Sequence, residues 1–454
     1  MKYRFFLQLC LAVAAIGAQA ALTVTGGALG PQLTPGATND VWANPPPAGA
    51  VFDRWVGDTG VLADLYAWHT TATMPSGSAA ITATYKSSPA WSPSTYILND
   101  LAPTDPNAIR LMYYFPPNPV GVIFRFHGSG GSAATLFAKV EDFTFARDAV
   151  AAGYAIASLD STDRVNKQWD DTATAANVDV VNVQAAINYF IGLGLMAAST
   201  PKFCTGMSDG GGFAPKAAYF LGFQGCGIWC AAGAPGALFN IMTVPTIWSL
   251  AQADDLYDHT NFLPASNAEL AGLTNRGVRG ELRENGPSPV YARRFLRIPY
   301  FTAADSQTIY DSLKAGGFLD AQDYLIADPA TSGWVSALPA GFLPYQSDIE
   351  DQLECCYSGH QFYSDFDNKA LQFFGALRPP VAGRGAIRAI MRQPDGSMLL
   401  TVAADAGQDY RVQASPDLAT WTTVFTSTDS GGTFDFTDTT TSNNPRRFYR
   451  TVSS

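Results

Sequence analysis

Residues Gly206-Met207-Ser208-Asp209-Gly210 spell G-x-S-x-G between two segments of different character. The preceding Lys202-Phe203-Cys204-Thr205 has the composition of a short buried strand, and the small residues from Gly211 to Tyr219 indicate the start of a helix. A sharp strand-to-helix turn strains its corner residue, and glycines on both sides avoid collisions with neighbouring elements. The pattern predicts a serine hydroxyl exposed above a helix N-terminus, a candidate nucleophile. The alternative is an ordinary loop serine in a glycine-rich chain.

A second glycine-rich turn lies upstream, where the apolar run 121–126 indicates a strand that leads into His127-Gly128-Ser129-Gly130-Gly131. Such a turn leaves backbone N–H groups unshielded, so they can point at a developing oxyanion together with the N–H of the residue after the nucleophile. We assign the oxyanion donors to the backbone of Ser129 and Asp209, with Gly130 as the nearest alternative. His127 is interpreted as a ring that braces the turn rather than as a base.

An acidic residue follows the next predicted strand downstream. Residues 245–250 have the pattern of a buried strand, and Asp254 and Asp255 come shortly after it. A residue just past a strand end lies on the same edge of a parallel sheet as the serine turn. Asp254 is the candidate acid and Asp255 the runner-up, because the sequence does not fix the strand end to one residue.

Only four histidines occur, which narrows the choice of a base. His69 lies in a separate N-terminal segment, His127 in the glycine-rich turn, and His259 too close behind the acid. His360, in a loop before the helix-like run 363–374, is left as the candidate base. The order Ser208, Asp254, His360 is the order that catalytic groups take in one class of serine hydrolases.

On these residues, the stretch from roughly Ala90 to Leu377 resembles an α/β-hydrolase, and the motif Gly206–Gly211 resembles those of secreted esterases of the polyhydroxybutyrate-depolymerase and feruloyl-esterase type. The resemblance implies an α/β fold with a doubly wound, mostly parallel sheet. It also implies a carboxylic ester as substrate. Asp209 stands where a small or amide residue is frequent in the family, which places a carboxylate near the expected oxyanion site.

The segment between the acid and the base, about 261–354, is predicted to be a cap insertion over the pocket. Its 302–318 part has a helical pattern with a capping-type start at Ser306. Candidate aromatic walls of the pocket are Trp169, Trp334, Phe342 and Tyr345, with the reservation that aromatic residues of caps usually form core.

The first twenty residues have the features of a secretory signal peptide. Lys2 and Arg4 precede an apolar run, and Ala18-Gln19-Ala20 offers a cleavage site. We therefore expect secretion, to the periplasm or beyond the cell, without a membrane span. The formal charge of −11 at pH 7 argues against nucleic acid as a partner.

Six cysteines are present, of which Cys10 lies in the signal segment. The odd number left indicates at least one free thiol or an intermolecular bridge in an oxidising compartment. A bridge involving Cys355 or Cys356 would brace the loop of His360, whereas Cys204 and Cys230 fit plain buried thiols. Neither the cysteine spacing nor the scarce histidines suggest a metal site, and no cofactor is expected.

Two small β modules are predicted to flank the α/β-hydrolase domain. Residues 21–88 show an F-x-x-W-x-G…M-P…T-A-T-Y pattern from Phe52 to Tyr85 and resemble one copy of the divergent repeats on bacterial surface and secreted proteins. A spacer or attachment role competes with that of a small β domain without a ligand, which we favour. Residues 378–386 form a predicted linker, and the short strands of 387–454 predict a β-sandwich.

The C-terminal module resembles β modules common in exported proteins of verrucomicrobia-like bacteria, through its pattern from Tyr410 to Trp421 and its ending Phe448-Tyr449-Arg450. Contact with a polysaccharide or the cell envelope competes with a structural or sorting role. For the whole chain, the sequence favours a secreted serine esterase that acts on plant-wall esters or polyesters. The alternatives are a serine peptidase on the same fold and a non-catalytic adhesion or glycan-binding protein.

Overall fold

The computed structural model describes residues 21–233, 244–254, 259–378, 386–403, 409–428, 433–443 and 446–453. The expected signal peptide and most of the expected linker therefore lie outside the described residues. The chain divides into two compact units, residues 1–376 and 377–454. Among the described residues, no helix combines the length and apolarity needed to cross a membrane.

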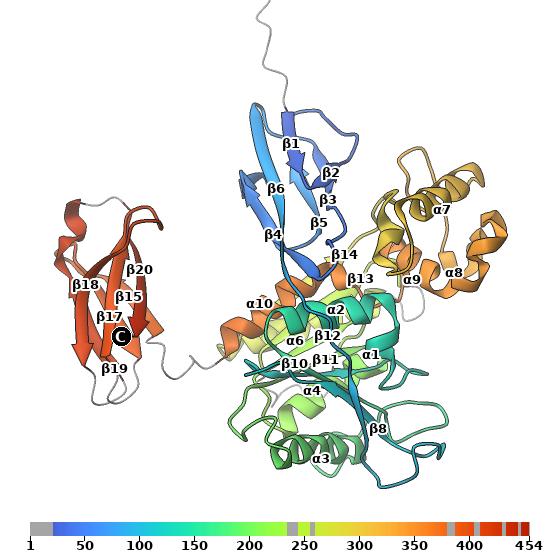
Figure 1. The fold of residues 1–454 in the computed structure, drawn as a ribbon, viewed down its shortest axis with the longest axis horizontal. Coiled ribbons are helices and arrows are strands. Elements are labelled where there is room, and N and C mark those ends of the chain that lie inside the picture. The colour runs from blue at the N-terminus through green and yellow to red at the C-terminus, as the bar shows by residue number, and fades with distance from the viewer. Residues whose placement is uncertain are drawn as a thin grey trace, which may run out of the picture. The chain divides into compact units, whose positions relative to one another are not determined.

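A mostly parallel eight-stranded sheet forms the centre of the first unit (Figure 1). Its strands lie in the order β14-β13-β12-β11-β9-β10-β8-β7. Strand β8 pairs antiparallel with both β10 and β7, and the other neighbouring strands pair in parallel. In chain order they are β7 (Ser94–Ile97), β8 (Arg110–Tyr114), β9 (Val122–Phe126), β10 (Ala155–Leu159), β11 (Lys202–Met207), β12 (Gly225–Trp229), β13 (Thr246–Ala251) and β14 (Gly280–Asn285). The class is therefore α/β, with small β sheets added.

Helices cover both faces of this sheet, which explains why its central strands are buried and mostly apolar. Helices α2 (Val140–Ala151) and α10 (Asp367–Leu377) lie on one face, and α3 (Val178–Gly192) and α4 (Asp209–Phe220) on the other (Figure 1). Every residue of β9, β10 and β12 is buried. The short helix α1 (Thr135–Ala138) follows the turn after β9.

The insertion between acid and base begins later than the sequence indicated. Residues 261–285, expected to belong to the cap, form most of α6 (His259–Asn275) and all of β14, which pairs in parallel with β13. The crossover helix and the edge strand thus continue the central sheet. The chain leaves the central sheet after Asn285, which is the last residue of β14 paired with β13.

The remaining insertion is a helical subdomain with its own apolar core, which includes Trp334 and Ile349. Its elements are η2 (Arg294–Arg297), α7 (Ala303–Ala315), α8 (Pro329–Ser332), η3 (Trp334–Ala337), η4 (Ala340–Tyr345) and α9 (Gln346–Tyr357). The N-cap of α7 is Thr302, which forms a capping box with Asp305. The expected capping start at Ser306 is therefore wrong by four residues.

The N-terminal β module consists of two three-stranded sheets, β1-β6-β4 and β2-β3-β5. Its elements are β1 (Ala21–Thr25), β2 (Gly27–Leu29), β3 (Thr38–Ala43), β4 (Ala50–Gly57), η1 (Thr59–Val61), β5 (His69–Thr73) and β6 (Ser78–Ser87). Phe52, Trp55 and Met74 of the repeat pattern are buried in its core. The module belongs to the same compact unit as the large sheet.

The second unit contains two antiparallel three-stranded sheets, β15-β16-β19 and β18-β17-β20. Its elements are β15 (Ala386–Arg392), β16 (Met398–Ala403), β17 (Asp409–Ser415), β18 (Thr422–Thr428), β19 (Thr433–Asp438), η6 (Thr439–Asn443) and β20 (Phe448–Ser453). Leu400 and Val402 of one sheet pack with Val412 of the other, as in a sandwich.

The junction of β11 and α4 leaves no room for side chains at two glycines. A Cβ on Gly206 would lie 1.9 Å from the carbonyl oxygen of Gly210, and one on Gly210 would lie 2.4 Å from that of Phe126. The strand, the helix that follows it and the neighbouring strand β9 therefore approach each other through backbone atoms alone. Glycine is required at both positions for steric reasons.

We predict that Gly206→Ala lowers the free energy of unfolding by at least about 3 kcal/mol, because backbone rather than a flexible side chain blocks the new methyl group. Urea unfolding followed by circular dichroism measures the change. Gly192→Ala at the end of α3 is the control, because a Cβ there meets nothing within 4 Å. Equal stability of the two variants would contradict the steric argument.

Candidate active site

Ser208 occupies the sharp turn between β11 and α4, with φ 55° and ψ −124°. This backbone conformation is rare for a residue with a side chain, and it is held because Ser208 N–H donates to the Trp229 carbonyl oxygen at 2.9 Å. The residue lies at the N-terminus of α4, where partial positive charge favours an anion. The strained corner that the sequence predicted is thus present at this serine.

The turn from His127 to Gly131 lies directly against this serine. A Cβ built on Gly128 would stand 3.3 Å from the Ser208 Cβ, so the absent side chain allows the close approach. His127 Nδ1 donates to the Gly128 carbonyl oxygen at 2.8 Å, while its Nε2 accepts the Ser161 N–H at 3.3 Å. Burial lowers the pKa of His127 to about 4. A neutral ring with both nitrogens engaged braces the turn, as expected.

Two backbone groups remain candidates for the oxyanion donors. The N–H of Gly130, the alternative donor, is directed at the Lys167 carbonyl oxygen at 3.3 Å. That contact favours Ser129, which is exposed at the turn, together with the N–H of Asp209. The Asp209 carboxylate accepts the Trp169 N–H at 2.8 Å, so it holds the neighbouring loop. Burial raises the pKa of this carboxyl group.

Asp254 and His360 form a hydrogen-bonded pair. His360 Nδ1 lies 2.7 Å from Asp254 Oδ2, and the side-chain exposures are 15% and 1%. Asp254 follows the end of β13, and His360 follows α9. The imidazole is thus oriented through Nδ1 by a buried carboxylate. Asp255 and the side chain of His259 lie outside the described residues.

Ser358, which sequence reasoning missed, ties the loop of the histidine to the strand of the aspartate. Its Oγ accepts the Gln252 N–H at 2.8 Å and donates to the Asn285 carbonyl oxygen, and its carbonyl accepts the Ala253 N–H at 3.0 Å. Its backbone is left-handed, with φ 68°. The residues just before Asp254 and just before His360 are therefore fastened together. A lone serine two residues from a histidine gives no sequence signal of this role.

Backbone hydrogen bonds connect the region of the Asp254–His360 pair to the strained Ser208. The Trp229 carbonyl that receives the Ser208 N–H belongs to the residue before Cys230, and Cys230 N–H donates to the Ser249 carbonyl of β13 at 2.9 Å. The Cys230 Sγ and the ligand atoms of Asp254 and His360 all lie within 4.8 Å of one another. The serine turn and the pair thus share one edge of the sheet, the edge at which parallel strands end.

Cys230 is a buried neutral thiol at this edge. Its Sγ donates to the Gln361 carbonyl oxygen at 3.2 Å, and burial followed by the Asp254 charge raises its pKa well above its ordinary value.

The structure contradicts the expected disulfide near His360. All five described cysteines are free and buried. Cys355 Sγ lies 3.7 Å from the Phe362 carbonyl oxygen, and Cys356 packs in the core of the helical subdomain. Both thiols lie within α9, which directs them into apolar packing, so apolar packing and backbone contacts rather than a covalent bond brace the loop.

A cleft of about 450 Å³ opens beside His360. It is lined mainly by charged and polar side chains of the helical subdomain, including Asp328, Glu350 and Glu354, and by Lys139. Burial, reinforced by the neighbouring carboxylates, raises the pKa of Glu354 to about 7. The cleft wall therefore carries less negative charge below neutral pH than its composition suggests.

The aromatic walls expected from the sequence are not part of this cleft among the described residues. Trp334 is buried in the subdomain core, where Phe342 also packs, and Tyr345 contacts Tyr300 and Phe301. Trp169 is buried beside the serine turn, stacked on Phe213, and its Nε1 donates to the His127 carbonyl oxygen at 2.8 Å. These side chains therefore pack against other residues instead of lining the cleft, in line with the reservation that aromatic residues of caps usually form core.

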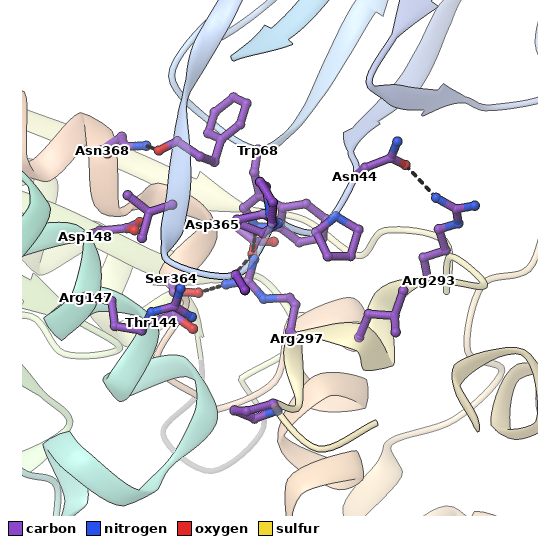
Figure 2. Close-up of a pocket in the computed structure, with 18 of the residues that line it drawn as sticks. Asn44, Trp68, Thr144, Arg147, Asp148, Arg293, Arg297, Ser364, Asp365 and Asn368 are labelled. Atoms are coloured by element: carbon purple, nitrogen blue, oxygen red, sulfur yellow. Dashed lines mark hydrogen bonds and ion pairs between the residues drawn. The ribbon is translucent and has the colours of Figure 1, made fainter. Parts of the chain in front are cut away.

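The N-terminal β module is fastened to the α/β body next to the histidine loop. Trp68 Nε1 donates to Asp365 Oδ1 at 2.5 Å, and Asp365 lies five residues after His360 (Figure 2). The indole ring also lies under the Arg297 guanidinium, at 4.5 Å from its centroid. Trp42 of the module stacks on Tyr291 of the body at 4.9 Å.

A buried charge network continues from this contact. Arg294, 2% exposed, pairs with Asp365 at 3.1 Å and with Glu141 at 3.6 Å, and Arg297 pairs with Glu141 at 3.1 Å. Burial opposes ionisation of Asp365, but Arg294 and other cations hold its pKa well below the usual range. His69 of the module lies 2.9 Å from Asp40 and 3.9 Å from Asp365. The module therefore supplies two partners of a carboxylate near the candidate base.

Comparison with protein families supports the assignment of the N-terminal module. A family model described as the divergent InlB B-repeat domain matches residues 13–89. This range contains the whole predicted repeat pattern, so the match fits a module of the surface-repeat type. A comparison with curated proteins gave no match.

Solved structures similar to this chain include several hydrolases. Esterase 2 of Thermogutta terrifontis, phosphorylated by paraoxon, aligns with 42% of this chain and 81% of its own, at 12% identity and a TM-score of 0.31. An S-formylglutathione hydrolase from Agrobacterium tumefaciens aligns with 42% of this chain over 86% of its own, at 15% identity and a TM-score of 0.33. An acylaminoacyl peptidase from Pyrococcus horikoshii aligns with 42% of this chain over 36% of its own, at 14% identity and a TM-score of 0.32.

We predict that Trp68→Phe lowers the free energy of unfolding of the first unit by about 1.5–3 kcal/mol, because a hydrogen bond to a buried charge is lost while the ring is kept. Chemical denaturation measures the loss. Trp421→Phe is the control, since the Trp421 indole donates to a backbone carbonyl in the second unit. A loss no larger than that of the control would show that the contact with Asp365 contributes little.

The stability supplied by His69 should depend on pH. Burial disfavours the charged ring, but the neighbouring carboxylates of Asp365 and Asp40 outweigh it and raise the pKa of His69 above 6.5. A raised pKa gives stability that is complete below about pH 6.5 and is lost as the pH rises through the folded value. The difference in unfolding free energy between the wild type and His69→Gln should therefore shrink from pH 6 towards alkaline pH. A difference that grows with pH would refute the assignment.

Proposed function

We propose that this protein is a secreted serine hydrolase that cleaves carboxylic esters. Ser208 is the nucleophile, His360 the general base and acid, and Asp254 the group that orients the imidazole. The observation that carries the proposal is the 2.7 Å bond between Asp254 and His360 at the sheet edge where Ser208 holds its strained turn. An oriented base of this kind is one of the arrangements that make a serine hydroxyl nucleophilic.

The reaction follows in two acyl-transfer steps. His360 Nε2 takes the Ser208 hydroxyl proton as Oγ bonds to the ester carbonyl carbon, and the carbonyl oxygen becomes an oxyanion. The bond to the alcohol then breaks, and His360 returns the proton to the leaving alcohol. Water repeats the sequence on the acyl-enzyme, which releases the acid and restores the Ser208 hydroxyl.

The oxyanion is assigned to the backbone N–H groups of Ser129 and Asp209. The close approach of Gly128 to Ser208 supports this assignment, because it brings the turn beside the nucleophile. Donors of this kind are fixed by the backbone before the reaction and need no reorganisation as charge develops. His127 contributes by holding the turn, and its low pKa keeps the ring neutral at working pH.

The substrate class is proposed from the chain as a whole. The signal-like N-terminus and the surface-repeat module fit an exported enzyme, and the two β modules fit one that acts on plant-wall esters or polyesters. Such an enzyme needs no cofactor and no nucleic-acid partner. The strongest rival within catalysis is a serine peptidase, which uses the same groups on the same fold. A non-catalytic adhesion protein is the rival outside catalysis.

We predict that Ser208→Ala and His360→Gln each reduce the turnover of p-nitrophenyl butyrate by about 10⁴-fold or more, because the members of a triad act as a unit. Asp254→Asn should cost on the order of 10⁴-fold through the wrong imidazole tautomer. Initial rates measure each loss. Ser199→Ala, at an exposed serine outside the site, is the matched control and should retain full activity.

Two measurements separate the rival functions. A fluorophosphonate probe should label the wild type and Ser199→Ala but not Ser208→Ala, whereas an adhesion protein would remain unlabelled. Matched butyryl ester and butyryl anilide substrates then divide esterase from peptidase. Faster cleavage of the anilide would overturn the ester assignment. A panel with acetylated xylan, methyl ferulate and polyhydroxybutyrate identifies the ester.

A further inference from the structure

A second cavity, separate from the cleft at His360, lies between the N-terminal β module and the α/β body (Figure 2). Its volume is about 230 Å³. The module contributes the loop 44–48, with three consecutive prolines, and the partly exposed ring of Tyr66. The body contributes helix α2, the segment around η2, and Asn368 of α10.

The cavity has hydrogen-bond donors with spare capacity. Arg147 Nη2 donates to the Ala50 carbonyl oxygen at 2.9 Å, and Arg293 Nη1 donates to Asn44 Oδ1 at 2.9 Å. Among the described residues, these are the only hydrogen bonds of the two side chains. A guanidinium group carries five N–H donors, so each arginine retains several for a molecule in the cavity.

The cavity also has an acceptor without a donor. Asp148 of α2 lines the cavity, is only 6% exposed, and its carboxylate bonds to none of the described residues. A carboxylate in this position is costly unless hydrogen bonds satisfy it. Its burial raises the pKa of Asp148 to about 6. Asn368 uses its amide N–H for the Phe52 carbonyl at 3.2 Å, which leaves the amide oxygen as a further acceptor.

This combination selects the ligand by charge and by hydrogen-bonding type. Asp148 repels an anion, and Arg147 with Arg293 repels a cation. A neutral molecule with closely spaced hydroxyl groups suits both, because each hydroxyl donates to a carboxylate and accepts from a guanidinium. The proline rings, Leu296 and Tyr66 offer apolar surface for its C–H groups, as in small-molecule sites generally.

We propose that this cavity binds one neutral sugar unit of a polysaccharide. The proposal goes beyond ester hydrolysis and does not depend on it, since no group of the cavity belongs to the triad. It gives the N-terminal module a role other than that of a spacer, because the module supplies one wall of the site. An enzyme that holds a glycan there would stay near esters carried on the same material.

The test is isothermal titration of the full-length Ser208→Ala protein with xylotetraose, cellotetraose and mannotetraose. At least one should bind at a single site, with a Kd in the micromolar to millimolar range. Asp148→Leu and Tyr66→Ala, each in the Ser208→Ala background, should weaken that binding about tenfold or more. Asp311→Leu, on an exposed turn of α7, is the matched control and should bind like its parent.

Asp148→Asn tests the same acceptor without a change of shape, in case the leucine variant fails to fold. It should also weaken binding, because the amide keeps one acceptor oxygen and loses the charge. Thermal unfolding verifies that each variant is folded. Three results would each overturn the proposal: no binding of the three oligosaccharides at millimolar concentration, equal affinity of the Asp148 variants and the control, or tighter binding of glucuronate or choline than of any neutral sugar.

Discussion

The backbone-to-backbone approach at the β11–α4 junction is the constraint on which the candidate site depends. Gly206 and Gly210 let the strand, the helix and β9 pack with no side chain between them. That packing forces Ser208 into its strained conformation and brings the turn after β9 against it. Strain of this kind persists only where surrounding structure over-determines the residue, and here the bond from Ser208 to Trp229 and the buried strands provide that support.

The other half of the site depends on fastening two distant segments. Asp254 and His360 are 106 residues apart and are separated by a crossover, an edge strand and a helical subdomain. Ser358 bonds to the backbone of the residue after β13 and of β14, so the loop of His360 and the strand end before Asp254 are held together. The geometry of the Asp254–His360 pair thus rests on a serine that takes no part in the proposed chemistry.

The sequence alone presents the N-terminal module as a separate domain, but in the structure its side chains contact the α/β body. Its Trp68 and His69 meet Asp365, and that carboxylate in turn pairs with the buried Arg294 and the partly buried Arg297. Buried ion pairs are weak evidence of stability, but removal of one partner leaves an uncompensated charge. The module and the body are therefore interdependent, and the cavity of Figure 2 exists only because both contribute walls.

The sequence by itself determined the features set by local sterics and residue type. These are the glycine-flanked serine, the apolar strands around it, the scarcity of histidines that singled out His360, and the position of Asp254 after a buried run. Tertiary structure alone decided that 280–285 belongs to the sheet, that Trp169 and Trp334 are core, that the cysteines stay free, and that the repeat module meets Asp365. Each of these depends on contacts between residues far apart in the chain, and local periodicity carries no information about which distant surface a segment will meet.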